Sequence, residues 1–159
     1  MAVAIYPGRF DPVTNGHLDI VDRASKIFDH LIIGIAAGDV KTNLFSAEER
    51  AELFKKATAQ YKNLSVEIFD GLTIDTARDL NVNVLIRGLR AVTDFTTEFD
   101  MALMNRDMEQ NIESIFFITD LGNLFLSASR VRELASYGVN VDQYVPEIVA
   151  KELTKKFNS

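Results

Sequence analysis

Short apolar runs rich in β-branched residues recur along the chain and alternate with segments of helical spacing. The runs are Val3–Tyr6, Leu31–Ala36, Leu64–Phe69, Val82–Ile86 and Ile115–Ile118. Continuous apolar strands that alternate with helices are typical of a parallel sheet covered on both faces. The pattern therefore predicts an α/β fold with a doubly wound, parallel five-stranded sheet and helices on both faces. Such sheets bind ligands at the carboxyl ends of their strands.

The segments between the runs carry helix signals. Ser46-Ala47-Glu48-Glu49 fits a capping box, in which the serine and the glutamate satisfy each other's backbone donors. The expected helices are 18–28, 47–60, 94–108 with Phe95, Phe99, Ala102 and Leu103 on one face, one that begins at Ser127 or Ser129 and ends near Tyr137-Gly138, and 147–157.

Length and composition indicate an ordinary globular protein. The 159 residues favour one domain, 1–159, and 47% of them are hydrophobic and 25% charged. We find no apolar run that could span a bilayer and no secretory signal, so a cytoplasmic protein without membrane contact is expected. The chain has no cysteine and two histidines, so we expect no metal site built from protein ligands. A net charge of −6 argues against nucleic-acid binding.

The stretch Gly8–His17 joins the first apolar run to the first helical segment. It reads as strand, glycine-containing turn and helix, with Gly16 and His17 at the helix start. Helix N-termini attract anions because unpaired N–H groups and the helix dipole point outward there. The turn is thus either an anion site in which His17 contacts developing charge, or an ordinary βα turn with an exposed histidine.

Other cations and hydroxyls follow later strands and should reach the same sheet edge. Lys41 lies in the polar loop Asp39–Asn43, and Arg87 and Arg90 flank Gly88-Leu89 directly after the fourth run. Arginine suits bidentate phosphate contacts, whereas most loop lysines are simply solvated. Ser127 and Ser129 begin a helix, either as plain caps or as a second phosphate-binding terminus.

Together these segments resemble a known family. Thr14-Asn15-Gly16-His17 resembles the T/HxGH signature of the nucleotidylyltransferase superfamily, and Leu126–Arg132 resembles its ISSTxxR-type signature. Tyr6-Pro7-Gly8, Phe10-Asp11-Pro12 and Ile86–Ala91 (IRGLRA) are similar to bacterial phosphopantetheine adenylyltransferases. The match covers nearly the whole chain in motif order and spacing, and it implies a Rossmann-like fold.

The resemblance implies a reaction. ATP and 4′-phosphopantetheine would give 3′-dephospho-coenzyme A and pyrophosphate, the penultimate step of coenzyme A biosynthesis, with Mg²⁺ accompanying ATP. It also implies a homohexamer and coenzyme A as a possible feedback ligand. The nucleophile is already a phosphate anion, so the protein has only to position two polyanions and stabilise charge.

The resemblance also assigns roles to individual residues. His17, Lys41 and Arg90 would be catalytic, and Arg9, Lys41, Thr73 and Arg87 would bind the pantetheine substrate. ATP would contact Arg9, Phe10, His17, Gly88, Leu89, Arg90, Glu98 and the loop residues Asn123, Leu124, Phe125, Leu126, Ser127, Ala128 and Ser129.

The chain departs from the family pattern at a few positions. Arg9 stands where the family has Ser or Thr, and we expect it to swing aside or contact phosphate without loss of activity. Ala128 replaces a serine, Thr96-Thr97 replaces Glu-Tyr, and Thr42-Asn43 follows Lys41 where Lys-Pro is common.

Two other functions remain open from the sequence. One is another small-molecule nucleotidylyltransferase, acting on nicotinamide mononucleotide or glycerol phosphate, although IRGLRA favours phosphopantetheine. The other is a non-catalytic nucleotide or coenzyme A sensor on the same fold, which Arg9 would permit.

Overall fold

A five-stranded parallel sheet forms the centre of the molecule. The computed structural model describes residues 1–39 and 41–159; Val40, in the polar loop expected after the second strand, lies outside the described residues. The strands are β1 (Val3–Gly8), β2 (His30–Ala36), β3 (Leu64–Phe69), β4 (Val84–Leu89) and β5 (Glu113–Ile118). Their order is β3-β2-β1-β4-β5, with parallel pairing throughout. The predicted doubly wound sheet is therefore confirmed.

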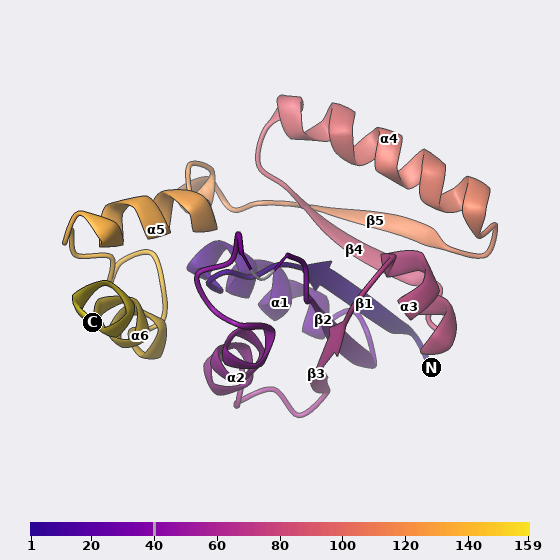
Figure 1. Cartoon of the computed structure of the whole chain (residues 1–159). Coiled ribbons are helices and arrows are strands. Elements are labelled where there is room, and N and C mark those ends of the chain that lie inside the picture. The colour runs from indigo at the N-terminus through magenta and orange to yellow at the C-terminus, as the bar shows by residue number, and fades with distance from the viewer. Residues whose placement is uncertain (40) are drawn as a thin grey trace.

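Helices connect the strands and cover the sheet (Figure 1). They are α1 (Asn15–Ser25), α2 (Ala47–Ala57), α3 (Thr73–Asp79), α4 (Val92–Met108), α5 (Ala128–Ser136) and α6 (Glu147–Asn158), with a 3₁₀ turn at Leu121–Asn123. The predicted helices are all present. Helix α1 starts at Asn15, just ahead of the Gly16 and His17 expected at its start, and α1 and α2 each end three residues sooner than expected.

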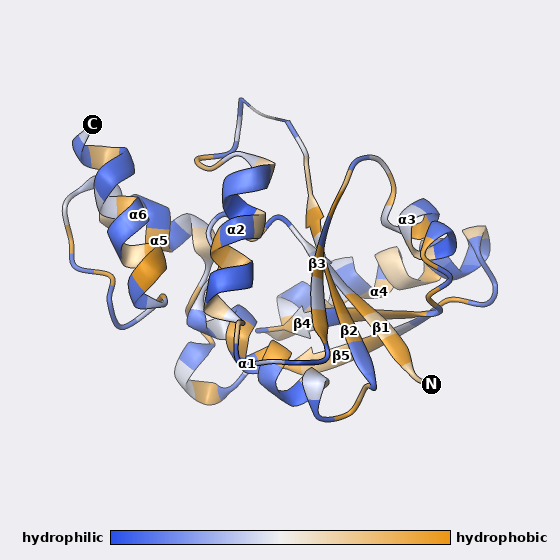
Figure 2. Ribbon diagram, turned by 90° about the horizontal axis from the view of Figure 1, so that it is seen from below, coloured by the Kyte–Doolittle hydropathy of each residue, from blue (hydrophilic) through white to orange (hydrophobic). Residues whose placement is uncertain are grey.

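Alternating residues of the strands supply a core on each face of the sheet. Ile33 of β2 packs with Val21 of α1 and Phe54 of α2, whereas its neighbour Ile32 packs on the opposite face with Ile74 of α3. Figure 2 shows hydrophobic residues concentrated along the central strands. Helices on both faces, as predicted, leave the carboxyl ends of the strands open for a site.

The capping box predicted at the start of α2 is present. The Ser46 hydroxyl accepts the Glu49 N–H at 3.1 Å, and the Glu49 carboxylate accepts the Ser46 N–H at 2.8 Å. The Ser46 N–H, and to a lesser degree the nearby Lys156 ammonium, lower the pKa of the Glu49 carboxyl. The cap fixes where α2 begins, directly after the loop that carries Lys41.

Strand β4 is longer than the apolar run that predicted it. The prediction ended the strand at Ile86, so that Arg87 and Gly88 would lie in a loop, but β4 continues to Leu89. Arg87 pairs in register with Phe116 and Gly88 with Phe117 of β5. Backbone pairing with β5 extends the strand through Arg87 and Gly88, a charged residue and a glycine that the apolar pattern alone would not assign to a strand.

Helix α4 differs from its prediction in burial. The spacing of Phe95, Phe99 and Leu103 predicts one apolar face, which would ordinarily be buried, but these side chains are 44–55% exposed. Within α4, every residue of which the structure describes, none is buried. Phe95 stacks on Phe99 and on Phe116 of β5, with ring centroids 5.6 and 6.2 Å apart. Much of the apolar surface of α4 is therefore left uncovered by the rest of this chain.

In the described part of the chain, no helix is long and apolar enough to cross a membrane.

Candidate active site

The turn between β1 and α1 is tightly built around Phe10. Phe10 is 4% exposed and adopts a positive φ of 48°, a strained conformation for a bulky residue. Its ring lies against Gly8, where a Cβ atom would meet the ring at 2.8 Å. The Asp11-Pro12 peptide bond that follows is cis. Gly8 is thus required because Phe10 folds back over the end of β1.

His17 completes the cap of α1. Thr14 is the N-cap; its hydroxyl accepts the His17 N–H, and its own N–H donates to His17 Nδ1 at 3.0 Å. His17 therefore occupies the position that a glutamate takes in the usual capping box. Because Nδ1 accepts this bond, the imidazole proton is on Nε2. A neutral Nε2–H donor is fixed at the helix N-terminus.

Burial and a nearby cation keep His17 neutral. Desolvation, reinforced by the charge of Arg90, lowers the pKa of His17 from its ordinary value to about 4. Phe10 packs edge-on against the imidazole at 4.9 Å between ring centroids. A neutral imidazole can approach a phosphate only as a hydrogen-bond donor, and here Nε2 is that donor.

We expect the His17 imidazole of the ligand-free protein to stay neutral from pH 7 down to pH 5. Unfolded chains bind a proton near pH 6.5, so the contribution of His17 to stability is complete above that pH and is lost as pH falls toward 4. Imidazole ¹⁵N NMR, with His17→Gln to assign the signal, measures this directly. A titration midpoint near 6.5 would contradict the description.

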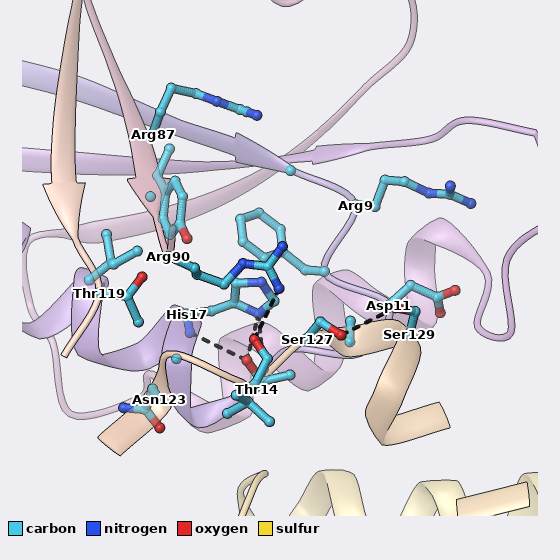
Figure 3. A pocket seen from close by; sticks show the side chains of 18 of the residues that line it. Arg9, Asp11, Thr14, His17, Arg87, Arg90, Thr119, Asn123, Ser127 and Ser129 are labelled. Atoms are coloured by element: carbon cyan, nitrogen blue, oxygen red, sulfur yellow. Dashed lines mark hydrogen bonds between the residues drawn. The ribbon is translucent and has the colours of Figure 1, made fainter. Parts of the chain in front are cut away.

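The cavity at the carboxyl ends of β1, β4 and β5 has a volume of about 420 Å³. Segments far apart in sequence meet there: the β1–α1 turn, the end of β4, Thr119 after β5, and the start of α5. Figure 3 shows His17 and Arg90 together in its centre. The predicted site residues that line it are Arg9, Phe10, His17, Arg87, Gly88, Arg90, Asn123, Leu126, Ser127, Ala128 and Ser129.

A second helix N-terminus faces the cavity at α5. Ser127 is the N-cap, its hydroxyl accepts the Arg130 N–H at 3.2 Å, and it lies 3.2 Å from the Ser129 hydroxyl. Arg90 reaches across from the end of β4 and donates to the Leu126 carbonyl at 3.2 Å. The N-termini of α1 and α5 and the Arg90 guanidinium thus converge on one space, which favours a polyanionic ligand.

Gly88 brings β4 close to α1. A Cβ atom at Gly88 would lie 2.5 Å from Ile20 Cδ1, much closer than real Cβ contacts. Ile20 is buried in the first turns of α1, and both residues line the cavity. The glycine therefore sets how closely the helix that carries His17 can approach the sheet.

Arg87 and Glu98 form a bidentate ion pair beside the main cavity. Arg87 Nε and Nη2 each donate to a Glu98 carboxylate oxygen at 2.8 Å, and Nη1 donates to the Pro7 carbonyl at 3.2 Å. The Glu98 bonds raise the pKa of Arg87 despite its burial. Glu98, expected beside ATP, instead lines a small adjoining cavity of about 20 Å³ with Arg87 and Thr73. The Glu98 carboxylate pairs with this half-buried arginine, a contact that residue spacing could not reveal.

Two buried charged side chains brace the first turn, and neither was predicted as a site residue. Arg50 of α2 is 1% exposed and donates to the carbonyls of Arg9, Ala36, Ala37, Phe45 and Ser46 at 2.7–3.2 Å. Asp11 is 2% exposed and accepts the N–H groups of Leu44 and Phe45 at 2.8 and 3.0 Å. Arg132 of α5 donates to the Asp11 carbonyl from the other side. Together they fix the turn to α2 and α5.

Lys41 and Arg9 lie at the edge of the site. Lys41 is exposed, does not line the main cavity, and donates its N–H to Asp39 Oδ1 at 2.9 Å. Arg9 lines the cavity, but its guanidinium points away from His17 and Arg90 (Figure 3) toward Thr42 and Asn43. Of the two outcomes expected for Arg9, the structure shows the side chain swung aside.

The structure adds cavity residues and leaves some predicted ones outside. Leu89, Leu124 and Phe125 do not line the cavity, whereas Asp11, Thr14, Thr119 and Arg132 do. Arg132 stands at the arginine of the ISSTxxR-type pattern, and Thr119 directly follows β5. The motif and the strand end could therefore have identified these two residues from the sequence. The side chains of Leu124 and Phe125 are 38% and 62% exposed.

Comparison with known proteins shows the class to which this fold and site belong. A cytidylyltransferase-like family model matches residues 5–134, and the chain belongs to that family of nucleotidyltransferases. Within it, the chain is 46% identical over 158 residues to a phosphopantetheine adenylyltransferase of Clostridium kluyveri, covering 99% of this chain and 96% of the relative. It is 45% identical over 157 residues to that of Caldanaerobacter subterraneus, with 99% and 98% covered. The protein is thus a member of the phosphopantetheine adenylyltransferase family.

Solved structures support the fold. A bifunctional NMN adenylyltransferase/ADP ribose pyrophosphatase from Francisella tularensis aligns with a TM-score of 0.74 and 17% sequence identity over 99% of this chain. A second structure of that protein, complexed with AMP and a manganese ion, aligns with a TM-score of 0.70. This chain spans about half the length of either one. At such identity the likeness supports the fold alone.

Proposed function

We propose that this protein transfers the adenylyl group of ATP to 4′-phosphopantetheine. A phosphate oxygen of phosphopantetheine attacks the α-phosphorus of ATP, the bond from that phosphorus to the bridging oxygen breaks, and pyrophosphate leaves. The products are 3′-dephospho-coenzyme A and pyrophosphate. The observation that carries the proposal is the convergence of His17, Arg90 and the N-termini of α1 and α5 on one cavity, in a chain of this family.

The attacking group needs no activation by the protein. A phosphate monoester is already an anion at neutral pH, so neither a general base nor a covalent intermediate is required. The barrier arises from bringing two polyanions together and from charge that develops on the α-phosphate and the leaving pyrophosphate. Fixed donors in a partly dehydrated cavity lower that barrier.

Apart from Arg9, each predicted site residue has a place in this scheme, although Glu98 acts through Arg87 rather than on ATP. The His17 Nε2–H stabilises the α-phosphate in the transition state, and Arg90 neutralises the departing phosphates. Gly88, Leu89, Phe10 and the 123–129 loop hold the nucleotide, with Ser127 and Ser129 at the N-terminus of α5 near its phosphates. Arg87 and Thr73, which lie together at the small cavity, contact the pantetheine arm, and Glu98 fixes Arg87. Lys41 reaches the phosphate of the acceptor.

The divalent cation enters with ATP. Both carboxylate oxygens of Asp11, the one acidic residue among those lining the main cavity, already accept backbone N–H groups. In residues 1–39 and 41–159 no group of three His, Asp or Glu side chains is arranged to hold a metal. The residues therefore suit Mg²⁺ that is bound by ATP phosphates and water as part of the substrate.

Pyrophosphate release tests the proposal. Purified protein is mixed with Mg·ATP and, in parallel, with phosphopantetheine, nicotinamide mononucleotide or glycerol phosphate. Release with phosphopantetheine alone is the expected result, and release with another acceptor identifies a different nucleotidyltransferase. Tight binding of ATP and phosphopantetheine without release would instead identify a sensor.

Coenzyme A, proposed as a feedback ligand, should inhibit release in the same assay. The proposal also places the reaction in the cytoplasm.

We also propose that the protein works as a homohexamer, in which α4 is covered by a second copy. Phe95, Phe99, Met101, Leu103, Met104 and Met108 are 44–62% exposed along this one helix. An apolar surface of this kind on a water-soluble enzyme marks a subunit contact. The same helix carries Glu98, so the contact would also support the ion pair with Arg87.

Leu103→Glu should disrupt that assembly. A carboxylate at a position that is 55% exposed costs the isolated chain little but cannot be buried against another copy. We expect the mass measured by light scattering to fall from that of the hexamer to that of smaller species. Ala59→Glu, which adds the same charge at an exposed turn after α2, is the matched control. An unchanged mass for Leu103→Glu would place the subunit contact elsewhere.

A further inference from the structure

We infer that Arg9 is a positioning residue that holds the 41–43 loop, and with it Lys41, in place for the acceptor phosphate. The inference rests on the proposed function and assigns Arg9 a role that acts through the loop rather than on the substrate. It follows from contacts between the first βα turn and residues more than 30 positions later in the chain.

The Arg9 side chain joins two polar residues of this loop. Arg9 Nε donates to Asn43 Oδ1 at 3.1 Å, and Nη2 donates both to Asn43 Oδ1 and, at 2.9 Å, to Thr42 Oγ1. The planar guanidinium thus bridges two neighbouring side chains, a geometry that a lysine cannot reproduce. Hydrogen bonds with a charged donor are stronger than neutral ones.

Both ends of this bridge are anchored to the sheet. Asn43 Nδ2 donates to the Ala37 carbonyl at 3.1 Å, and the same carbonyl accepts Arg50 Nη2 at 2.8 Å. Arg50 Nη1 also donates to the Arg9 carbonyl at 2.7 Å. Groups that meet at the end of β2 therefore fix both the backbone and the side chain of Arg9. The bridge is held in place relative to the sheet.

Lys41 is the residue that this bridge positions. It immediately precedes Thr42, whose hydroxyl accepts from Arg9 and donates to the Asp39 carbonyl at 3.1 Å. A lysine is a flexible point charge, so its backbone position decides where the ammonium group can reach. By fixing Thr42 and Asn43, Arg9 restricts the backbone of Lys41 at the edge of the site and lowers the entropic cost of engaging a phosphate.

The direction of the Arg9 side chain argues against direct contact with the reacting phosphates. Its guanidinium points away from His17 and Arg90, where the transferred group lies in the proposed reaction (Figure 3). Three of its donor interactions already go to loop oxygens. Direct binding of substrate would require these interactions to break first.

Steady-state kinetics of Arg9→Ala, Asn43→Ala and the double variant test the inference. Each single variant should raise KM for phosphopantetheine about tenfold, the effect expected when one or two charged hydrogen bonds are lost. The KM for ATP should stay within about twofold of the wild-type value. The double variant should be no worse than the poorer single one, because both remove the same bridge. Lys62→Ala, which removes an equal charge at an exposed turn, is the control and should behave as wild type.

Two further comparisons separate the bridge from a direct phosphate contact. In a Lys41→Ala background, Arg9→Ala should add less than about twofold to KM, and Arg9→Lys should leave KM raised in the wild-type background. Full multiplication of the Lys41 and Arg9 effects, or recovery by Arg9→Lys, would overturn the inference in favour of charge acting directly on the phosphate.

Hydrogen exchange gives a readout that does not depend on turnover. The amides of Lys41 and Thr42, which donate to Asp39, should exchange several-fold faster in Arg9→Ala than in wild type or Lys62→Ala. Unchanged exchange would overturn the inference even if the enzyme is active. If the wild type does not release pyrophosphate, the proposed reaction is wrong. The exchange result then still shows whether Arg9 holds the loop.

Discussion

Replacing His17 with alanine is expected to lower kcat about 10²–10³-fold while the Kd for ATP changes only a few-fold. The reason is geometric. Thr14 holds Nδ1, so the Nε2–H is fixed before substrate arrives, and in the proposed reaction its contact with the α-phosphate strengthens as charge develops. Single-turnover pyrophosphate release and calorimetric ATP binding measure the two quantities separately.

His17→Gln controls for damage to the helix start. A glutamine at this position can accept the Thr14 N–H and complete the capping box, so α1 should be as stable as in wild type. Turnover should stay low, because the amide does not place a donor where the imidazole Nε2 lies. Equal losses of kcat and of ATP affinity in His17→Ala would make His17 a ground-state binding residue.

Arg50→Met is expected to lower the free energy of unfolding by about 3–5 kcal/mol. The side chain is 1% exposed and donates to five backbone carbonyls. Methionine would remove the donor of the Arg9, Ala36 and Phe45 carbonyls, whereas the Ala37 carbonyl keeps Asn43 Nδ2 and the Ser46 carbonyl keeps the backbone N–H of residue 50. Because the first turn and the end of β2 lose a common anchor, kcat should fall as well. Urea unfolding at a fixed protein concentration measures the change, since assembly contributes to apparent stability.

Arg78→Met is the matched control. Arg78 makes ion pairs with Asp75 and Glu109 at the surface, with 52% of its side chain exposed, and such pairs contribute little. We expect a change below about 1 kcal/mol. A loss for Arg50→Met no larger than this would show that the carbonyls find other donors.

The parts of the fold that depend on local pattern could be predicted from the sequence. Strand β3 matches its prediction at both ends, and the Ser46–Glu49 capping box and the end of α5 at Tyr137 followed from local hydrogen-bonding chemistry. The predicted motif residues around His17, Arg90 and Ser127 do line one cavity, because the carboxyl ends of parallel strands share an edge.

What could not be predicted depends on partners distant in the sequence. Glu98 is eleven positions from Arg87, and only the packing of α4 beside β4 shows that they pair. Arg50 resembles any helix arginine until the fold places five carbonyls around it. Arg9 finds Asn43 34 positions away. The spacing on α4 predicts an apolar face correctly but cannot tell whether the sheet or another subunit covers it.

The contact between Gly88 and Ile20 has a consequence for how this sequence can change over time. With a Cβ at position 88 only 2.5 Å from Ile20 Cδ1, alanine can enter there only if Ile20 adopts another rotamer, the side chain at position 20 shrinks or α1 moves outward. Outward movement would carry the Nε2–H of His17 away from the phosphate. We therefore expect substitutions at positions 20 and 88, 68 residues apart, to be coupled, because a glycine on one side permits a large side chain on the other.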